Sequence, residues 1–246
     1  MFTYLKNSFA RKIARRVTKE YPPIIDHLNM NQYGEIDFAN WSSPLAPKIT
    51  LNEATVAFFN QFIKAGDLAI DIGANIGDTT VPMALCTGMT GITIGFDPNP
   101  YVFKILETNA NLNKDKYVIH PHRCAISATP KSFYYISSEA TFGNGAISET
   151  RDSKHGKFVF DGMVEGIHLK TFLETKYASM IQKLSFIKID TEGYDKEIIK
   201  SISDLIQAYK PVIVAESFGK ASEAAKVELF EVIKNNGYDI FYFADF

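Results

Sequence analysis

The sequence has little of what exported or membrane-spanning proteins depend on. Only two cysteines occur among its 246 residues, Cys86 and Cys124, and they lack the paired spacing of a zinc site. Two cysteines cannot form a disulfide framework, which suits a reducing compartment. No uninterrupted apolar run approaches the roughly 20 residues that cross a bilayer, and the N-terminus lacks the apolar core of a signal peptide. We therefore expect a cytoplasmic protein whose cysteines are core thiols.

The sequence also lacks a strong excess of charge of either sign. Its 26 Lys and Arg residues face 28 Asp and Glu residues, for a net charge of -2. Six of the basic residues lie within residues 1–20, so the rest of the chain is acidic overall. An acidic body is a poor match for a long nucleic-acid footprint. We expect no nucleic-acid partner, and the 46% hydrophobic content is that of an ordinary folded domain.

The basic N-terminal segment has the pattern of an amphipathic helix. Apolar residues recur at three- or four-residue intervals through residues 2–17, Lys and Arg fill positions between them, and Pro22 and Pro23 follow. Such a helix either lies on an anionic membrane surface, as a peripheral contact through residues 1–20, or packs on its own domain or on a partner. We predict that residues 1–48 form this helix and a connecting segment, ahead of a main domain of residues 49–246.

Short apolar runs then alternate with helical patterns. The predicted strands are LAIDI, GITIGF, YVIH, LSFIKI, PVIVA and YDIFYF, and helices are expected over residues 52–64, up to about Gly88, and over residues 101–111. This alternation predicts an α/β fold with a doubly wound, mostly parallel sheet and helices on both faces. Residues 131–168 interrupt it with β-rich patches and a loop rich in Gly, Ser and Asn. We interpret them as an inserted β-hairpin and loop near the active site.

The first predicted strand ends in a sharp turn, DIGANIGDT. In an open parallel sheet, ligands bind beyond the carboxyl ends of the strands, where a turn into a helix presents free backbone amides. Glycines in the turn let the backbone approach a ligand closely. The candidate cofactor-binding residues here are Asp71, Gly73, Ala74, Asn75, Gly77, Asp78 and Thr79.

The next strand ends in an acid that suits a ribose. Asp97 lies twenty residues after Gly77 and is followed by Pro98 and Asn99. An acid at this spacing typically accepts hydrogen bonds from the two ribose hydroxyls. After the third strand, the backbone near Cys124 and Ala125 is expected to line an adenine pocket. Together these positions predict a nucleotide or nucleoside cofactor.

The charge of the turn distinguishes between such cofactors. The dinucleotide fingerprint G-x-G-x-x-G fails, because Asn75 and Asp78 stand where two of its glycines would be. Asp71 and Asp78 would repel a pyrophosphate but favour the cationic sulfonium and ammonium of S-adenosylmethionine. S-adenosylmethionine is therefore the predicted cofactor, and a nicotinamide oxidoreductase on the same fold is the rival interpretation.

The segments DIGANIGDTT, FDPNP, FIKIDTEGYDKEI and PVIVAE, in this order, resemble the FkbM family of S-adenosylmethionine-dependent methyltransferases. The resemblance spans about residues 50–245 and implies a class I, Rossmann-like fold that methylates hydroxyl oxygens, often on sugars or polyketide rings. It implies that the turn at Asp190–Gly193 lies beside the transferred methyl. It also implies donor contacts by Asp71, Gly73, Asn75 and Gly77, and ribose contacts by Asp97 and Asn99. Asp97 departs from the family, which commonly has glutamate there.

Methyl transfer to oxygen needs a group that takes the proton of the acceptor hydroxyl. Lys188, Asp190 and Glu192 alternate at the end of an apolar strand, so an ideal strand would turn all three to one side. We predict Asp190, which also borders the donor, as base or acceptor-orienting residue, then Glu192, then Glu216 after the next strand. The alternative is that Asp190 and Lys188 only form an ion pair while Glu192 caps the following helix.

Histidines and a metal ion are the remaining candidates for the chemistry. His155, in RDSKHGK, could enter the acceptor site on a mobile lid, or it is a solvated loop residue. His120 and His122 share one face of a strand, a spacing that suits a metal or is incidental. Asp190 and Glu216 could together hold a divalent cation that lowers the pKa of the acceptor hydroxyl. The sequence leaves metal dependence open.

The prediction from these observations is a methyltransferase that moves a methyl group from S-adenosylmethionine to a hydroxyl, chiefly of a sugar or glycoconjugate. A polyketide-like or lipid hydroxyl is the alternative acceptor among small molecules. A non-catalytic binding module on the same fold is the alternative from another class. The sequence leaves a homodimer open.

Overall fold

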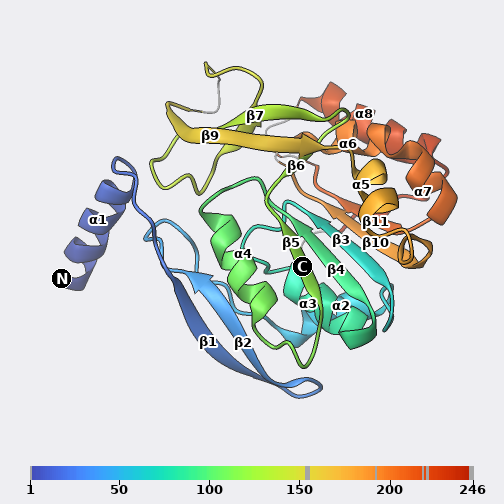
Figure 1. Cartoon of the computed structure of the whole chain (residues 1–246). Coiled ribbons are helices and arrows are strands. Elements are labelled where there is room, and N and C mark those ends of the chain that lie inside the picture. The colour runs from blue at the N-terminus through green and yellow to red at the C-terminus, as the bar shows by residue number, and fades with distance from the viewer. Residues whose placement is uncertain (1, 153–155, 192, 218, 220–221, 244–246) are drawn as a thin grey trace.

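A five-stranded, wholly parallel sheet forms the centre of the protein (Figure 1). The computed structural model describes residues 2–152, 156–191, 193–217, 219 and 222–243. The strand order is β11-β10-β3-β4-β5, so the chain leaves β3 in one direction and later returns to β10 on its other side. The strands are β3 (Leu68–Ile72), β4 (Ile92–Phe96), β5 (Ile119–His122), β10 (Leu184–Ile189) and β11 (Val212–Ala215). The topological switch point, where ligands bind in such sheets, lies between β3 and β10.

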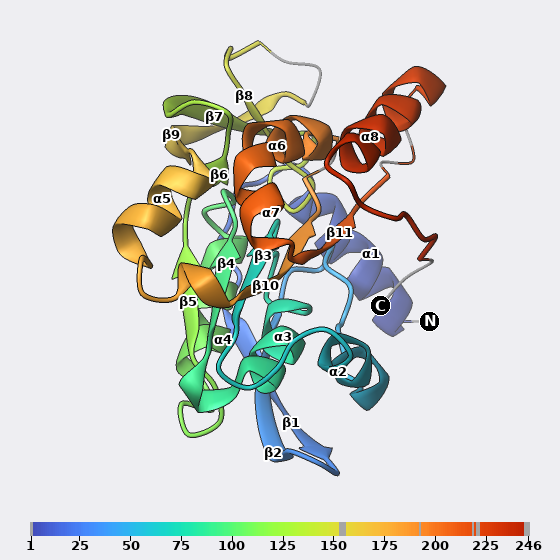
Figure 2. The same ribbon diagram turned by 90° about the vertical axis from the view of Figure 1, so that its right-hand side faces the viewer.

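Helices cover both faces of this sheet (Figure 2). One face packs against α2 (Glu53–Asn60), α3 (Thr80–Thr87) and α4 (Val102–Asn111). The other packs against α5 (Leu169–Lys176), α6 (Asp195–Ser201), α7 (Ser203–Tyr209) and α8 (Glu223–Asn235). Two short 3-10 turns, η1 (Gly88–Thr90) and η2 (Ile181–Lys183), also occur among the described residues. Because alternate residues of a strand face opposite sides, β3, β10 and β11 each contribute to both cores, and the predicted doubly wound fold is confirmed.

The predicted insertion forms a second, smaller sheet. Its order is β6-β9-β7-β8, and β7 pairs antiparallel with both β8 and β9. The strands are β6 (Ala125–Ile126), β7 (Lys131–Ser137), β8 (Ala146–Ser148) and β9 (Phe158–Ile167). A small apolar cluster that includes Phe133, Tyr135 and Val164 supports this sheet. The segment predicted as a polar loop over residues 143–148 therefore includes an edge strand, β8.

The N-terminal segment contains a β-hairpin that the sequence did not predict. β1 (Pro23–Met30) and β2 (Gly34–Trp41) pair antiparallel, and Ile36 and Phe38 are buried in the same core as α2 and α3. The side chain of Asn109 in α4 accepts a hydrogen bond from the Ala39 amide at 2.7 Å and donates one to the Ala39 carbonyl at 3.0 Å. This contact joins segments 70 residues apart, so local sequence patterns do not indicate it.

The predicted N-terminal helix is present as α1 (Phe2–Ala14), which projects from the body in Figure 1. Phe9, Ile13 and Val17, on and just after the helix, are 66%, 40% and 54% exposed. The end of the helix is attached to the second sheet, because the Arg15 carbonyl accepts a hydrogen bond from the Ala140 amide at 3.2 Å. None of the described helices is both long and apolar enough to cross a membrane.

The last predicted strand, YDIFYF, does not form. Residues 238–243 carry no strand, and Phe241 and Tyr242 are 85% and 94% exposed. Phe243 instead stacks on Phe58 of α2, with ring centroids 4.6 Å apart. An aromatic run can satisfy a strand pattern and still find its contacts on a helix, since β propensity reflects packing partners more than backbone preference.

Candidate functional site

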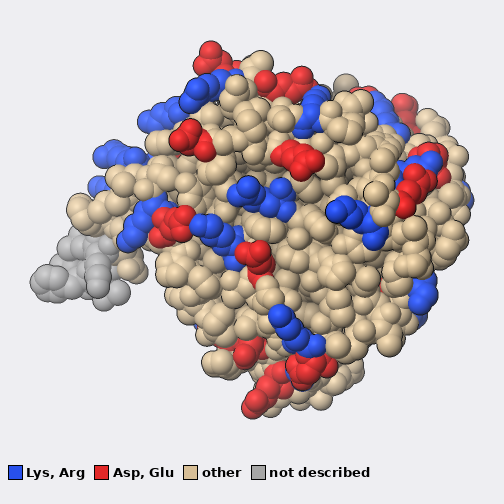
Figure 3. Space-filling view, in the orientation of Figure 1, with Lys and Arg blue, Asp and Glu red and all other residues tan. Residues whose placement is uncertain are grey.

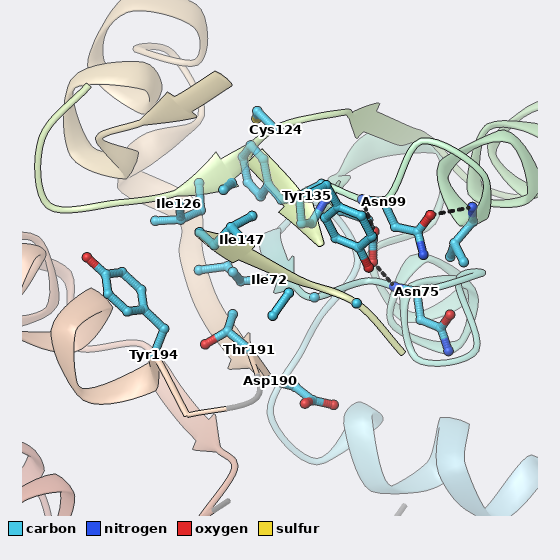
Figure 4. A pocket seen from close by; sticks show the side chains of 18 of the residues that line it. Ile72, Asn75, Asn99, Cys124, Ile126, Tyr135, Ile147, Asp190, Thr191 and Tyr194 are labelled. Carbon is cyan, nitrogen blue, oxygen red and sulfur yellow. Dashed lines mark hydrogen bonds between the residues drawn. The ribbon is translucent and has the colours of Figure 1, made fainter. Parts of the chain in front are cut away.

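A cavity of about 380 Å³ lies at the carboxyl ends of β3, β4 and β10, beneath the second sheet (Figure 4). This is the position that the sheet topology predicts for a ligand. Asp190 and Thr191 border the cavity on the side opposite Cys124. The predicted site residues that line it are Gly73, Asn75, Asp97, Pro98, Asn99, Cys124, Ala125 and Asp190.

Asp97 is held in the cavity wall by the backbone. Its Oδ2 accepts a hydrogen bond from the Asn75 amide and its Oδ1 accepts one from the Asn99 amide, both at 2.8 Å. Burial raises the pKa of Asp97 to about 7, although these two hydrogen bonds act to lower it. Each carboxylate oxygen can accept more than one hydrogen bond. Asp97 therefore has a fixed orientation and the remaining capacity to bind two hydroxyls.

The backbone amides of the turn after β3 are used within the protein. The amides of Gly73 and Ala74 both donate to the Phe96 carbonyl, at 2.9 and 3.0 Å, and the Gly77 amide donates to the Ala74 carbonyl at 2.8 Å. The expectation that this turn offers free amides is therefore wrong at these three residues. A turn built in this way suits a ligand held by side chains better than a phosphate cradled by amides.

Asp71 does not line the cavity. It is fully buried, its Oδ2 accepts hydrogen bonds from the hydroxyls of Thr79 at 2.8 Å and Thr80 at 2.7 Å, and its Oδ1 lies 3.3 Å from the Lys188 ammonium. The predicted direct contact of Asp71 and Thr79 with a ligand is thus corrected: both fix the start of α3. Asp78 also lies outside the cavity lining, and burial raises its pKa to about 6.

Lys188 joins the ends of β3 and β10. Its ammonium lies 3.3 Å from Asp71 and from Asp190, and it donates to the Gly73 carbonyl at 3.4 Å. Burial acts to lower the pKa of Lys188, but the carboxylates of Asp71, Asp190 and Asp78 raise it above its ordinary value. Lys188 therefore remains a cation that positions Asp190. The ion pair considered as the alternative to a catalytic role is present, and Asp190 also reaches the cavity.

Gly73 permits a close approach between two strand ends. Its φ is +78°, and a Cβ atom there would lie 1.8 Å from the Asp190 carbonyl oxygen. The sequence predicted that this glycine lets the backbone approach a ligand. Gly73 lines the cavity and also comes close to the backbone of the turn after β10, so it determines how near Asp190 comes to the cavity.

Replacing Gly73 with alanine is expected to destabilise the fold by several kcal/mol, because the clash is with backbone and the left-handed φ adds strain. Gly34→Ala is the matched control, since Gly34 has a φ of +71° but no atom nearer to an added Cβ than 3.9 Å. It is expected to cost only about 1 kcal/mol. Urea unfolding of the two variants measures the difference, and equal losses would show that the contact with Asp190 is unimportant.

Asp195, which the sequence analysis missed, supports the turn after β10. Its Oδ2 accepts hydrogen bonds from the Thr191 hydroxyl at 3.1 Å and the Gly193 amide at 3.2 Å, and burial raises its pKa to about 6. Asp190 is 45% exposed and lies at the start of this turn. The spacing of four residues between Thr191 and Asp195, at the beginning of a helix, is the signal that could have identified it.

Apolar and aromatic residues form the part of the cavity that suits a flat ring. Cys124 and Ala125 border it as expected, together with Ile126, and burial raises the pKa of Cys124 to about 12, so its thiol stays neutral. Tyr135 of β7 and Ile147 of β8 also border the cavity, near Cys124 and Ile126 (Figure 4). Neither was predicted, because their role depends on how the insertion folds over the parallel sheet.

Several predicted residues serve the structure or lie elsewhere. Ala74 and Gly77 are outside the lining. The Asn99 side chain accepts hydrogen bonds from the amides of Tyr101 and Val102 at the start of α4 and donates one to the Phe142 carbonyl at 2.7 Å. Its amide group is thus engaged in joining α4 to the insertion.

Glu216 and the two histidines of β5 are not in the cavity lining. Glu216 is exposed at the end of β11, and Glu192 and His155 lie outside the described residues. His120 and His122 are both hydrogen-bonded to the Tyr177 hydroxyl, at 2.9 and 3.0 Å, which gives them a structural role. Within the described part of the chain, no group of three or more His, Cys, Asp or Glu side chains could hold a metal ion.

Comparison with solved structures gives several methyltransferases. The structure titled Methyltransferase FkbM from Methylobacillus flagellatus KT is 12% identical, with 73% of this chain and 44% of that chain covered and a TM-score of 0.44. Fibrillarin from Aeropyrum pernix, with natively bound S-adenosyl-L-methionine, is 12% identical over 92% and 90% of the two chains, with a TM-score of 0.41. TYW2 from P. horikoshii in complex with MeSAdo is 21% identical over 41% and 36%, with a TM-score of 0.32.

The chain thus spans less than half the length of two of these structures. No match was found among curated proteins. A model of the methyltransferase FkbM domain matches residues 71–240, which is more than half of the chain. The matched region begins at Asp71 and includes Asp97, Asp190 and the whole second sheet. The chain belongs to the FkbM family of methyltransferases.

Proposed function

We propose that the protein transfers a methyl group from S-adenosylmethionine to a hydroxyl oxygen of a sugar or glycoconjugate. The main observation in support of this proposal is that one cavity contains two carboxylates in different environments. Asp97 is buried and fixed by two backbone amides, whereas Asp190 is partly exposed at the other end. The first suits the ribose of a nucleoside and the second suits an acceptor that exchanges a proton.

The cavity residues fit the donor part by part. Asp97 would accept hydrogen bonds from the ribose hydroxyls, while Cys124, Ala125 and Ile126 would contact the adenine. The methionine portion would then lie toward Gly73 and Asp190, where the carboxylates of β3 and β10 gather. Because Lys188 neutralises part of that charge, the environment remains suited to a sulfonium without being strongly anionic.

Asp190 would accept the proton of the acceptor hydroxyl while the oxygen of that hydroxyl forms a bond to the methyl carbon. The donor supplies the methyl group, its carbon–sulfur bond breaks, and the products are a methyl ether and S-adenosylhomocysteine. The ion pair with Lys188 holds Asp190 in one orientation, which favours an in-line arrangement. Such positioned proton transfer contributes about 10²- to 10⁴-fold to a rate.

The acceptor class rests on the family resemblance and on the charge of the surface. Lys and Arg side chains lie among Asp and Glu side chains over the face shown in Figure 3, without one continuous basic patch. This favours an uncharged polyol over a nucleic acid. The direct test is release of S-adenosylhomocysteine with a panel of methyl glycosides and glycolipids. If S-adenosylhomocysteine is released with none of these compounds but is released with a polyketide-like alcohol, the sugar acceptor is wrong and the alternative acceptor is supported.

Donor binding is expected to strengthen as pH rises from about 6 to about 8. Burial raises the pKa of Asp97 to about 7, and only the ionised carboxylate accepts hydrogen bonds from both ribose hydroxyls. At about pH 6 roughly one tenth of the free protein is ionised at Asp97, so affinity is expected to be about tenfold lower than at pH 8. Calorimetry with S-adenosylhomocysteine measures this slope. Asp97→Asn should bind weakly at every pH, and an unchanged slope in that variant would assign the titration elsewhere.

We also propose that α1 contacts an anionic membrane surface. Phe9, Ile13 and Val17 are exposed, and Lys12 and Arg16 lie between them in the sequence. Flotation with phosphatidylserine-containing vesicles is expected to carry the protein, whereas vesicles of phosphatidylcholine alone are not. The variant Lys12→Glu with Arg16→Glu should stay unbound. The charge-matched control, Lys114→Glu with Lys176→Glu, should float as the unchanged protein does, and equal flotation of both variants would contradict the proposal.

A further inference from the structure

A second cavity, of about 320 Å³, lies beside the first. The two share Asn75 and Gly143, so they adjoin at the turn after β3 and at the insertion. Figure 4 shows the side chain of Asn75 pointing away from Tyr135 and Ile147, which border the first cavity. Asn75 therefore belongs to both: its amide fixes Asp97, and its exposed side chain faces away from that cavity. We propose that this second cavity binds the sugar ring of the acceptor, an inference that rests on the proposed function.

Four segments of the chain line this cavity, namely Arg15, residues 41–49, residues 75–76 and residues 139–144, and side-chain contacts hold parts of it in place. Arg15, after α1, pairs with Glu139 of the insertion at 3.3 Å. The side chain of Asn40 holds the connection after β2 in place, because it accepts a hydrogen bond from the Ile49 amide and donates one to the Ile49 carbonyl, both at 2.8 Å. These contacts fix the positions of residues that line or flank the cavity. Its volume is near the lower end of the roughly 300–1,000 Å³ typical of ligand pockets.

The lining of the second cavity combines an apolar wall with polar groups. Trp41, Leu45, Ala46 and Ile49 supply the apolar wall. Asn75, Glu139 and Asn144 supply amide and carboxylate groups. The C–H face of a sugar ring can pack on the apolar wall, and its hydroxyls can form hydrogen bonds with the amide and carboxylate groups. Aromatic side chains that also carry a polar atom suit such mixed ligands.

The charge of the lining also favours an uncharged polyol. The Arg15 cation is already paired with Glu139, so the cavity offers no excess positive charge for a phosphate or carboxylate.

The test uses ligand-observed NMR saturation transfer with the full chain saturated by S-adenosylhomocysteine and a fixed panel of methyl glycosides. At least one glycoside is expected to show a signal with the unchanged protein. Ala46→Phe, which fills the cavity, should abolish the signal and leave S-adenosylhomocysteine affinity within about twofold. Ala178→Phe, the same change at an exposed position, should behave as the unchanged protein does.

Glu139→Gln provides a second variant that keeps the side-chain shape, in case phenylalanine at position 46 prevents folding. It is expected to weaken the glycoside signal and leave S-adenosylhomocysteine binding intact. A signal that persists in both variants, or no glycoside signal with the unchanged protein, would overturn the assignment. Loss of S-adenosylhomocysteine affinity in Ala46→Phe would instead make the cavity part of the donor site. Absence of S-adenosylhomocysteine binding by the unchanged protein is a separate result that defeats the proposed function.

Discussion

Asp97→Ala is expected to weaken binding of S-adenosylhomocysteine by about 100-fold or more. Two hydrogen bonds from ribose hydroxyls to a carboxylate are worth about 1.5 to 3 kcal/mol each, and 1.4 kcal/mol is a factor of ten in affinity. The variant also leaves the amides of Asn75 and Asn99 without their acceptor, which loosens the turn after β3. Isothermal titration calorimetry at about pH 8 measures the change.

The control for this experiment is Asp161→Ala, since Asp161 is exposed on β9 and lies outside both cavity linings. It is expected to bind S-adenosylhomocysteine as the unchanged protein does. Circular dichroism of both variants shows whether the fold is retained. If Asp97→Ala is folded and its affinity is within about threefold of the unchanged protein, the ribose is not held by Asp97.

Asp190→Asn is expected to bind the donor normally and to turn over about 10²- to 10⁴-fold more slowly. Asparagine keeps the shape of the side chain and loses the ability to take a proton. The site that Lys188 organises is expected to persist, because its ammonium also contacts Asp71 and the Gly73 carbonyl. The measurement is the rate of S-adenosylhomocysteine release at saturating donor and acceptor.

The matched control is Asp204→Asn, which removes a surface carboxylate paired with Lys170. Its turnover should equal that of the unchanged protein. A loss in Asp190→Asn that appears only as a higher KM would make Asp190 an acceptor-binding residue rather than a base. Full turnover by Asp190→Asn would assign the proton transfer to another group, with Glu192 and Glu216 as the next candidates.

The parallel sheet could be predicted from the sequence because its strands are buried on both faces. Such strands are short, nearly continuous apolar runs, and LAIDI, ITIGF and LSFIKI have this form. The ligand position then followed from topology, since the turns after these strands gather at one edge of the sheet. The positions of Asp97 and Asp190 in one cavity thus required no knowledge of side-chain packing.

The hairpin β1–β2 could not be predicted in the same way. β1 carries mostly exposed or half-buried residues, and its attachment depends on Asn109, a polar residue of a distant helix. The opposite error occurred at YDIFYF, where an aromatic run packs on α2 instead of adding a strand. Both errors arise because tertiary partners, not local propensity, decide whether a marginal segment becomes a strand.

The role of Asp71 shows where charge alone misleads. An acid at the end of β3 was expected to face the ligand, and Asp97, the acid ending β4, does line the cavity. Asp71 is instead surrounded by Thr79, Thr80 and Lys188. The sequence does not reveal this difference, because Lys188 lies more than 100 residues away and reaches Asp71 only through the pairing of β10 with β3. The residues that hold a site in place are therefore harder to predict than those that line it.

The most direct test of the account is calorimetry of the unchanged protein with S-adenosylhomocysteine and, separately, with NAD. The turn after β3 has amides that are already bonded within the protein, and Asp97 has a fixed orientation. Together they predict one binding site for S-adenosylhomocysteine and no detectable heat with NAD. No binding of S-adenosylhomocysteine at any pH between about 6 and 8, or tighter binding of NAD, would contradict it.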